Sequence, residues 1–214
     1  ANISAIKIIS EKVRADNPYI KQVVGGVHAT LDKNLLNTLT CIDYSIQREG
    51  EEAFTALVEK ADPKTIPGVI SRGKNSLVNT GIAPIIKDID NLPMPERKKF
   101  WGIPELERKN VDVSYICTIR GCPYKCTYCA SPFHWDRKTT RLRSPESVIE
   151  EMKELKKNYW KATKYDYSAS ANISDKESLK IEDNTLVYFV DDVFTVHKKR
   201  VKKLLRMMID QKLG

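Results

Sequence analysis

Apolar residues in the first 80 positions recur with two different spacings that alternate along the chain. The helical spacing joins apolar residues over 6–13, over 31–39 and over the run EEAFTALVEKA at 51–61. Two short apolar runs, QVVGG at 22–26 and YSIQ at 44–47, lie between these segments and are typical of strands. Helices that alternate with strands at this spacing predict a doubly wound α/β domain with a parallel sheet.

The pattern changes after residue 68. GVISRGKNSLVNTG at 68–81 predicts a hairpin that closes the first block. Residues 81–100 carry prolines and charges without a helical period, which predicts a linker. The division expected from these boundaries is an α/β domain over 1–80, the linker over 81–100 and a second domain over 101–214.

The second domain again alternates strand and helix. VDVSYICTI at 111–119 and LVYFV at 186–190 predict strands, and residues 144–160 predict a helix whose N-terminus Ser144 can cap. Residues 161–184 are polar and aperiodic, which predicts a long loop. The last helix has an expected apolar stripe that consists of Val201, Leu204, Leu205, Met208 and Ile209.

Composition excludes several classes of protein. Hydrophobic residues make up 41% and charged residues 30%, and no apolar run approaches the length of a membrane span. Five cysteines are an odd number, and the chain opens without a signal peptide, so we expect a reducing, cytoplasmic compartment. The net charge of +8 is spread over helix faces, which favours a solvated surface over a nucleic-acid patch.

Three cysteines carry the strongest chemical signal. Cys122, Cys126 and Cys129 stand in GCPYKCTYC, with Tyr128 directly before the last of them. A structural zinc site closes with four ligands, whereas a [4Fe-4S] cluster held by three cysteines keeps one iron open for another ligand. The count of three favours the cluster. A four-cysteine zinc site that adds Cys117 is the alternative, although Cys117 stands in an apolar run and is expected to be a core residue of a strand.

The spacing Cys-x-x-x-Cys-x-x-Cys with an aromatic before the third cysteine resembles the signature of the radical SAM superfamily. The resemblance implies that the three cysteines hold a [4Fe-4S] cluster and that the open iron binds S-adenosylmethionine beside Tyr128. It also implies reductive cleavage to a 5'-deoxyadenosyl radical, a small-molecule substrate and an electron donor such as ferredoxin or flavodoxin.

The first block adds a resemblance to the cobalamin-binding class of that superfamily. VVGGVHAT, REGEEAF and NLPMPE follow one another in the order typical of that class. Gly25 and Gly26 permit close backbone approach at the carboxyl edge of a sheet, and the resemblance implies that they, with Glu49 and Gly50, lie along the cobalamin tail. A structural turn is the alternative for the glycine pair. The implied fold is a partial Rossmann-like domain followed by the first units of a radical SAM (β/α) partial barrel.

The chain departs from that class at three places. No Asp-x-His-x-x-Gly motif is present to ligate cobalt, and His28 does not correspond to its histidine. Arg48 stands where the class usually has glycine. Few strand-helix units are visible in either block, so we expect a piece cut at both ends that binds cobalamin weakly and cleaves S-adenosylmethionine slowly without coupled turnover.

FVDDVFT at 189–195 matches an acidic pair of the cobalamin-binding class, which makes Asp191 and Asp192 candidates for the ammonium group of S-adenosylmethionine. Capping of the next helix is the alternative. Arg141 and Arg143 also recur in the class, with a salt-bridging or solvated role as the default. The function implied is cobalamin-dependent methyl transfer to an unactivated carbon or related radical chemistry, and a zinc-containing binding module without turnover is the alternative.

Overall fold

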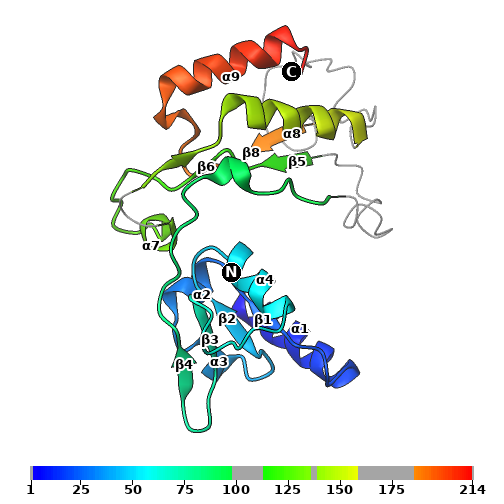
Figure 1. Ribbon diagram of the computed structural model, residues 1–214, viewed down its shortest axis with the longest axis vertical. Coiled ribbons are helices and arrows are strands. Elements are labelled where there is room, and N and C mark those ends of the chain that lie inside the picture. The colour runs from blue at the N-terminus through cyan, green and yellow to red at the C-terminus, as the bar shows by residue number, and fades with distance from the viewer. Residues whose placement is uncertain (1, 98–112, 136–138, 159–185, 214) are drawn as a thin grey trace, which may run out of the picture. The chain divides into compact units, whose positions relative to one another are not determined.

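The computed structural model describes residues 2–97, 113–135, 139–158 and 186–213 (Figure 1). The predicted loop at 161–184 therefore lies outside the described residues. The chain divides into two compact units. We call residues 1–87 with 121–140 the N-terminal unit, and residues 88–120 with 141–214 the C-terminal unit. No helix of the described residues is long and apolar enough to cross a membrane.

A four-stranded sheet organises the N-terminal unit. Its strands are β1 (Val23–Val24), β2 (Tyr44–Ile46), β3 (Val69–Arg72) and β4 (Leu77–Asn79), in the order β1-β2-β3-β4. β1 and β2 are parallel as predicted, and the predicted hairpin is the antiparallel pair β3 and β4. β3 also runs antiparallel to β2, so the sheet is mixed and the expectation of a fully parallel sheet is wrong.

Helices cover this sheet on both faces. α1 (Ile3–Asp16), α2 (Val27–Leu31) and α3 (Leu35–Thr38) enclose one core with Val24 and Ile70. α4 (Glu51–Val58) packs on the other face, where Ile46 and Val69 are buried. The single helix expected over 31–39 is two short helices, because α2 ends at Leu31 and the chain turns before α3 begins.

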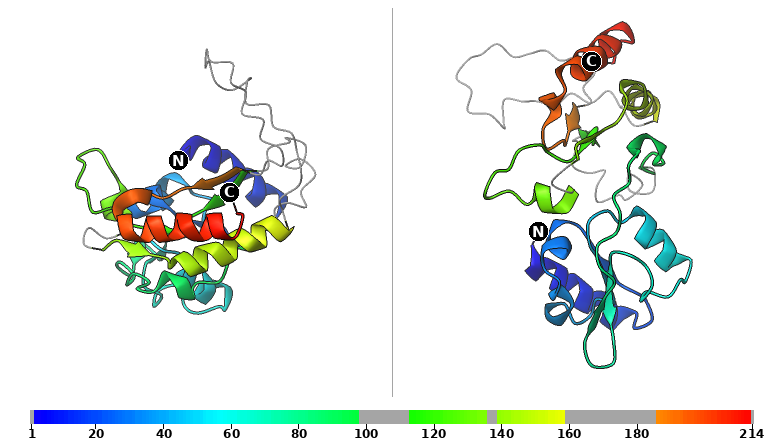
Figure 2. Two further views of the ribbon diagram at one scale, coloured as in Figure 1. Left: turned by 90° about the horizontal axis from the view of Figure 1, so that it is seen from above. Right: turned by 60° about the vertical axis from the view of Figure 1, so that its left-hand side comes forward.

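The described part of the C-terminal unit contains two strand pairs and two long helices. β5 (Val113–Ile116) and β8 (Leu186–Phe189) are parallel, and β6 (Ile119–Arg120) pairs antiparallel with β7 (Arg141–Leu142). α8 (Pro145–Asn158) and α9 (Lys198–Asp210) lie side by side (Figure 2). The Ser144 hydroxyl accepts the Ser147 N–H at 3.1 Å, which confirms the expected cap of α8. Two single 3-10 turns, η1 (Ile89–Asn91) and η3 (Phe194–Val196), complete this unit.

α8 supplies most of the core of this unit. Val148, Ile149, Met152 and Leu155 are at most 1% exposed, and they pack with Ile116 and Leu204. The stripe predicted for α9 is partly wrong. Val201 and Leu204 are buried, but Leu205 is 43% and Ile209 74% exposed, while Arg200 is only 7% exposed. The helix is therefore turned so that a charged residue, and not the outer leucine and isoleucine, reaches the interior.

Candidate functional site

The three cysteines of the predicted motif lie on one loop whose base is closed. Ile119 pairs with Leu142 and Arg120 with Arg141, so β6 and β7 bring the two ends of residues 121–140 together. Gly121 adopts a φ of +101°, and a Cβ at this position would lie 2.4 Å from the carbonyl oxygen of Thr139. A residue with a side chain does not fit there, so the loop requires glycine directly before Cys122.

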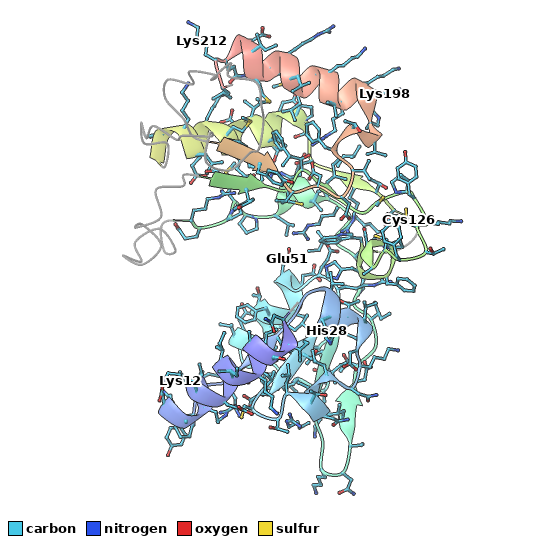
Figure 3. The ribbon with its side chains drawn as sticks, turned by 180° about the vertical axis from the view of Figure 1, so that it is seen from behind. Lys12, His28, Glu51, Cys126, Lys198 and Lys212 are labelled. Atoms are coloured by element: carbon cyan, nitrogen blue, oxygen red, sulfur yellow. The ribbon has the colours of Figure 1, made fainter. Side chains whose placement is uncertain are left out.

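All three thiols are free, and each is at least partly accessible. Cys126, which Figure 3 labels, is exposed, and Cys122 and Cys129 are half-buried. The Cys129 N–H donates to the Cys126 carbonyl at 3.2 Å, and the Ser131 N–H points to the Cys129 sulfur at 3.4 Å. An N–H directed at sulfur suits a thiolate ligand. Tyr128 is 90% exposed beside this turn.

The described side chains do not form a ready-made metal site. No group of three His, Cys, Asp or Glu residues among them lies close enough together to hold a metal ion. What fits an iron-sulfur cluster is the donor set: three free thiols on one closed loop, with a backbone donor already directed at one sulfur. The thiols must converge when the cluster is assembled.

Cys117 has a different environment from these three cysteines. β5 ends at Ile116, so the expectation that Cys117 is a core residue of this strand is wrong, and its side chain is half-buried just beyond the strand. Its thiol donates to the Ile119 carbonyl at 3.3 Å. Burial raises the pKa of Cys117, and the charge of Asp191 raises it further. A neutral thiol is a poor metal ligand. Cys41, the remaining cysteine, is half-buried in the N-terminal unit.

Asp191 is hydrogen-bonded to the residues that follow β5. Its Oδ1 accepts the N–H groups of Thr118 at 2.5 Å and Ile119 at 2.9 Å, and its Oδ2 accepts the Thr118 hydroxyl at 2.6 Å. Asp192 is exposed. Neither carboxylate supplies the cap that the alternative reading expected, since η3 has no side-chain cap and the His197 ring caps α9.

A buried ion-pair network surrounds the same stretch of backbone. Glu151, 1% exposed, pairs with both Arg97 and Arg143. Arg143 Nη1 also donates to the Cys117 carbonyl at 3.2 Å, and Arg200 Nη2 donates to the Thr118 carbonyl at 3.2 Å. The salt-bridging role given as the default for Arg143 is confirmed, and Arg141 is buried at 7% exposure.

Sequence analysis missed Glu151, Arg97 and Arg200. The available signal was the position of Glu151, which lies three residues after Val148 and four before Leu155 on the apolar stripe of α8. A carboxylate on a buried helix face needs a cationic partner. Arg200 was hidden in the basic run HKKRVKK, whose other charges gave no reason to single it out.

The glycine-pair loop lies at the carboxyl end of β1. Gly26 has a φ of +87° and begins α2, and a Cβ there would meet no atom within 4 Å, so its backbone conformation and not lack of space favours glycine. Gly25 has a φ outside the left-handed region. The Thr30 hydroxyl lies 3.0 Å from the Gly26 carbonyl and accepts the Arg48 N–H at 2.8 Å.

Arg48 adopts a φ of +61°. This is the position where the cobalamin-binding class usually has glycine, and the left-handed backbone gives the physical reason. Next to it, Glu49 is 7% exposed, and its Oε2 accepts the Ile86 N–H at 2.9 Å. Gly50 precedes α4 as its N-cap. Glu49 therefore ties the turn before α4 to the chain that follows the hairpin.

The helix after the cysteines also belongs to the N-terminal unit. α7 (Ser131–Trp135) packs against α2, and His134 Nδ1 lies 3.1 Å from the Thr30 hydroxyl. His134 is 8% exposed, and its ring meets Trp135 edge to face. The cysteine loop and the glycine-pair loop are thus connected through one threonine.

Known proteins are similar to this chain in sequence and in fold. The profile of the radical SAM superfamily matches residues 116–200. An uncharacterized methyltransferase of Pyrococcus horikoshii is 29% identical over 86% of this chain and 36% of its own length. The anaerobic magnesium-protoporphyrin IX monomethyl ester cyclase of Cereibacter sphaeroides is 30% identical over 64% of this chain and 24% of its own length. The chain thus spans about a third or less of these relatives.

Solved structures confirm the predicted fold class. The radical S-adenosylmethionine methyltransferase TsrM from Kitasatospora setae, solved with tryptophan and a SAM analogue, superposes with a TM-score of 0.66 at 20% identity. The match covers 98% of this chain and 36% of TsrM. A second TsrM structure, with cobalamin and a [4Fe-4S] cluster, gives a TM-score of 0.65. With the motif at its cysteine loop and the profile match that includes it, this chain belongs to the radical SAM superfamily.

Proposed function

We propose that this chain is the part of a radical enzyme that binds a [4Fe-4S] cluster and S-adenosylmethionine. The observation that carries the proposal is the closed loop with three free, accessible thiols, because family membership alone does not say which residues hold a cluster. With both groups bound, one-electron reduction of the sulfonium would break its bond to the 5' carbon, release methionine and supply a 5'-deoxyadenosyl radical.

The residues of the chain have distinct tasks in this proposal. Cys122, Cys126 and Cys129 would hold the cluster, and Tyr128, which is exposed, would contribute to the site of S-adenosylmethionine. The acidic pair Asp191 and Asp192 follows β8 at the carboxyl end of a parallel strand, where ligands of α/β sheets commonly bind. A carboxylate there attracts the ammonium group of the methionine moiety.

Cobalamin and methyl transfer form the second part of the proposal. The loop of Gly25 and Gly26 at the end of β1, with Glu49 and Gly50 at the end of β2, supports a site for the cobalamin tail. TsrM was solved with cobalamin and a cluster, and the relative from Pyrococcus is named a methyltransferase. Both support methyl transfer to an unactivated carbon or related radical chemistry here.

The remaining parts of the proposal concern the whole protein. A small molecule is the proposed substrate, and a reductant such as ferredoxin or flavodoxin is the proposed partner, in the cytoplasm. The proposed domain division is the cobalamin-binding-like block at 1–80, the linker at 81–100 and the radical SAM block at 101–214.

Anaerobic reconstitution tests the central claim. We expect about four irons and four sulfides per chain, and no cluster after Cys122→Ala, Cys126→Ala or Cys129→Ala. Cys41→Ala is the matched control and should retain the cluster. One bound zinc without visible absorption would contradict the proposal and favour the binding module. Dithionite reduction in the presence of S-adenosylmethionine should then release 5'-deoxyadenosine, as measured by chromatography.

Gly26 tests the cobalamin part separately. Gly26→Val should impair cobalamin retention by the natural protein, because a β-branched residue resists a φ of +87°. Gly81→Val is the control and should retain it, because Gly81 has the same φ of +87° and no atom within 4 Å of a new Cβ but lies after β4, outside the glycine-pair loop. Equal retention in both variants, measured from the cobalamin absorption spectrum, would favour a structural turn.

A further inference from the structure

The two aspartates that follow β8 have unequal surroundings, although the sequence treats them as a pair. The strand ladder continues one step beyond β8, because the Val190 N–H donates to the Ile116 carbonyl at 3.0 Å. At the next residue the ladder is replaced by a side chain. Asp191 takes the N–H groups of both Thr118 and Ile119, which no strand partner satisfies at this position.

The carboxylate of Asp191 has little capacity left for a ligand. Two carboxylate oxygens offer about four acceptor positions, and the two N–H groups and the Thr118 hydroxyl use three of them. Thr118 itself is 0% exposed. An incoming ammonium group with three donors would therefore have to displace bonds that hold the backbone in place.

Two arginine side chains donate hydrogen bonds to the carbonyl groups of residues 117 and 118. Arg143 reaches the Cys117 carbonyl, and Arg200 reaches the Thr118 carbonyl. The backbone N–H of Arg143 also donates to the Thr118 carbonyl, at 2.9 Å. Every hydrogen-bonding group of Thr118 is thus held by β7 and its neighbours or by Asp191. This residue lies four positions before Cys122, so it forms the base from which the cysteine loop starts.

We propose that Asp191 is a positioning residue that fixes the base of the cysteine loop through Thr118 and Ile119. The contacts that carry this proposal lie within the C-terminal unit, and its readout at the cluster rests on the function proposed above. Asp192, the next residue, is exposed.

Paired isosteric variants test the positioning role. Asp191→Asn replaces one acceptor oxygen by an amide that cannot accept N–H donors, so we expect less than half of the wild-type iron content and an altered EPR spectrum of the reduced cluster before any ligand is added. Asp192→Asn changes the neighbouring, exposed carboxylate and is the matched control, which should keep the wild-type iron content and spectrum.

Thr118→Val keeps the test decisive if Asp191→Asn does not fold. Valine has nearly the shape of threonine but lacks the hydroxyl bond to Asp191, so it should shift the EPR spectrum in the same direction by a smaller amount. Circular dichroism identifies an unfolded variant. A purely structural role would lower the melting temperature but leave the spectrum of the assembled cluster unchanged.

Wild-type iron content and spectrum in Asp191→Asn and Thr118→Val would refute the positioning role, and so would an equal loss of iron in Asp192→Asn. Cluster retention in Cys122→Ala would instead refute the proposed function, and that failure is distinguishable because it does not involve either aspartate.

Discussion

At the scale of single residues, the chain distinguishes cysteines by their surroundings. Cys117 stands only five residues before Cys122, and sequence alone leaves both as possible ligands. The structure shows that Cys117 is half-buried and that its thiol donates a hydrogen bond to the Ile119 carbonyl, whereas Cys126 is exposed. Spacing indicated the cluster motif, but the ligand count depends on burial, which spacing does not encode.

Thiol alkylation tests this distinction. Burial, and then the charge of Asp191, raises the pKa of Cys117, so its thiolate becomes available only at higher pH than an ordinary thiol. We expect iodoacetamide at pH 8 to modify Cys126 several times faster than Cys117 in the cluster-free protein, as measured by peptide mass spectrometry. Comparable rates in the folded protein would show that Cys117 is not protected, and denaturation should equalise them.

Gly121 gives a second prediction at this scale. Gly121→Ala places a Cβ 2.4 Å from the Thr139 carbonyl and demands a positive φ from a residue with a side chain. We expect a loss of stability on the order of 1–3 kcal/mol, measured by denaturant unfolding, together with reduced cluster assembly. Gly50→Ala is the matched control, because its new Cβ would have only ordinary contacts. An unchanged midpoint for Gly121→Ala would mean that the loop base adapts.

Gly26 and Arg48 show which backbone conformations the sequence alone does and does not predict. The glycine pair was predictable as a turn from its place after an apolar run. The left-handed backbone at Arg48 was not, because arginine gives no local signal for a positive φ. Its conformation depends on the Thr30 hydroxyl, which belongs to a different element and holds the Arg48 N–H.

At the scale of elements, apolar periodicity predicted α8 well and α9 only in part. Both helices have leucine and isoleucine at helical spacing, but α9 is also rich in lysine and arginine on all sides. The contacts of the Arg200 guanidinium with the Arg143 and Thr118 carbonyl groups turn this residue inward, and Leu205 and Ile209 face away from the core. Which face of α9 is buried depends on its contacts with other elements, and the spacing of apolar residues along the helix gives no information about those contacts.

Truncation at two positions tests this difference between the helices. Met152 is 0% exposed in the core, so Met152→Ala should cost about 2–5 kcal/mol of unfolding free energy. Ile209 is 74% exposed, so Ile209→Ala should change it by no more than about 0.5 kcal/mol. Denaturant unfolding of both variants provides the measurement. A larger loss for Ile209→Ala than for Met152→Ala would contradict the packing described for α9.

At the scale of the whole molecule, part of the stability depends on pH through the carboxylate of Asp43. In the N-terminal unit, Asp43 joins the strand end to α1 through Arg14, and it also accepts the Gln22 N–H at 2.9 Å. Burial by itself raises the pKa of Asp43. The bonds from Gln22, Lys21 and Arg14 outweigh burial, so the net pKa lies below the ordinary value.

A lowered pKa fixes the direction of the acid response. The folded state binds the Asp43 proton less tightly than the unfolded state, so this contribution to stability is present above the ordinary aspartate pKa and is lost as pH falls through the lower folded pKa. Asp43→Asn should destabilise the protein at pH 7 and flatten this part of the acid dependence, as measured by melting temperature between pH 7 and 3. If the melting temperature of Asp43→Asn falls with pH as steeply as that of the wild type, other carboxylates determine the acid dependence of stability.

The division into units has a consequence for how this protein can be cut and recombined. The backbone passes from one unit to the other after residues 87, 120 and 140, because the cysteine loop is an excursion from the C-terminal unit into the N-terminal one. A single cleavage therefore never yields both units intact. Proteolysis at residue 87 would leave the cysteines on the fragment that lacks their neighbours in α2. Exchange of the first block between related proteins accordingly has to carry the cysteine loop along with it.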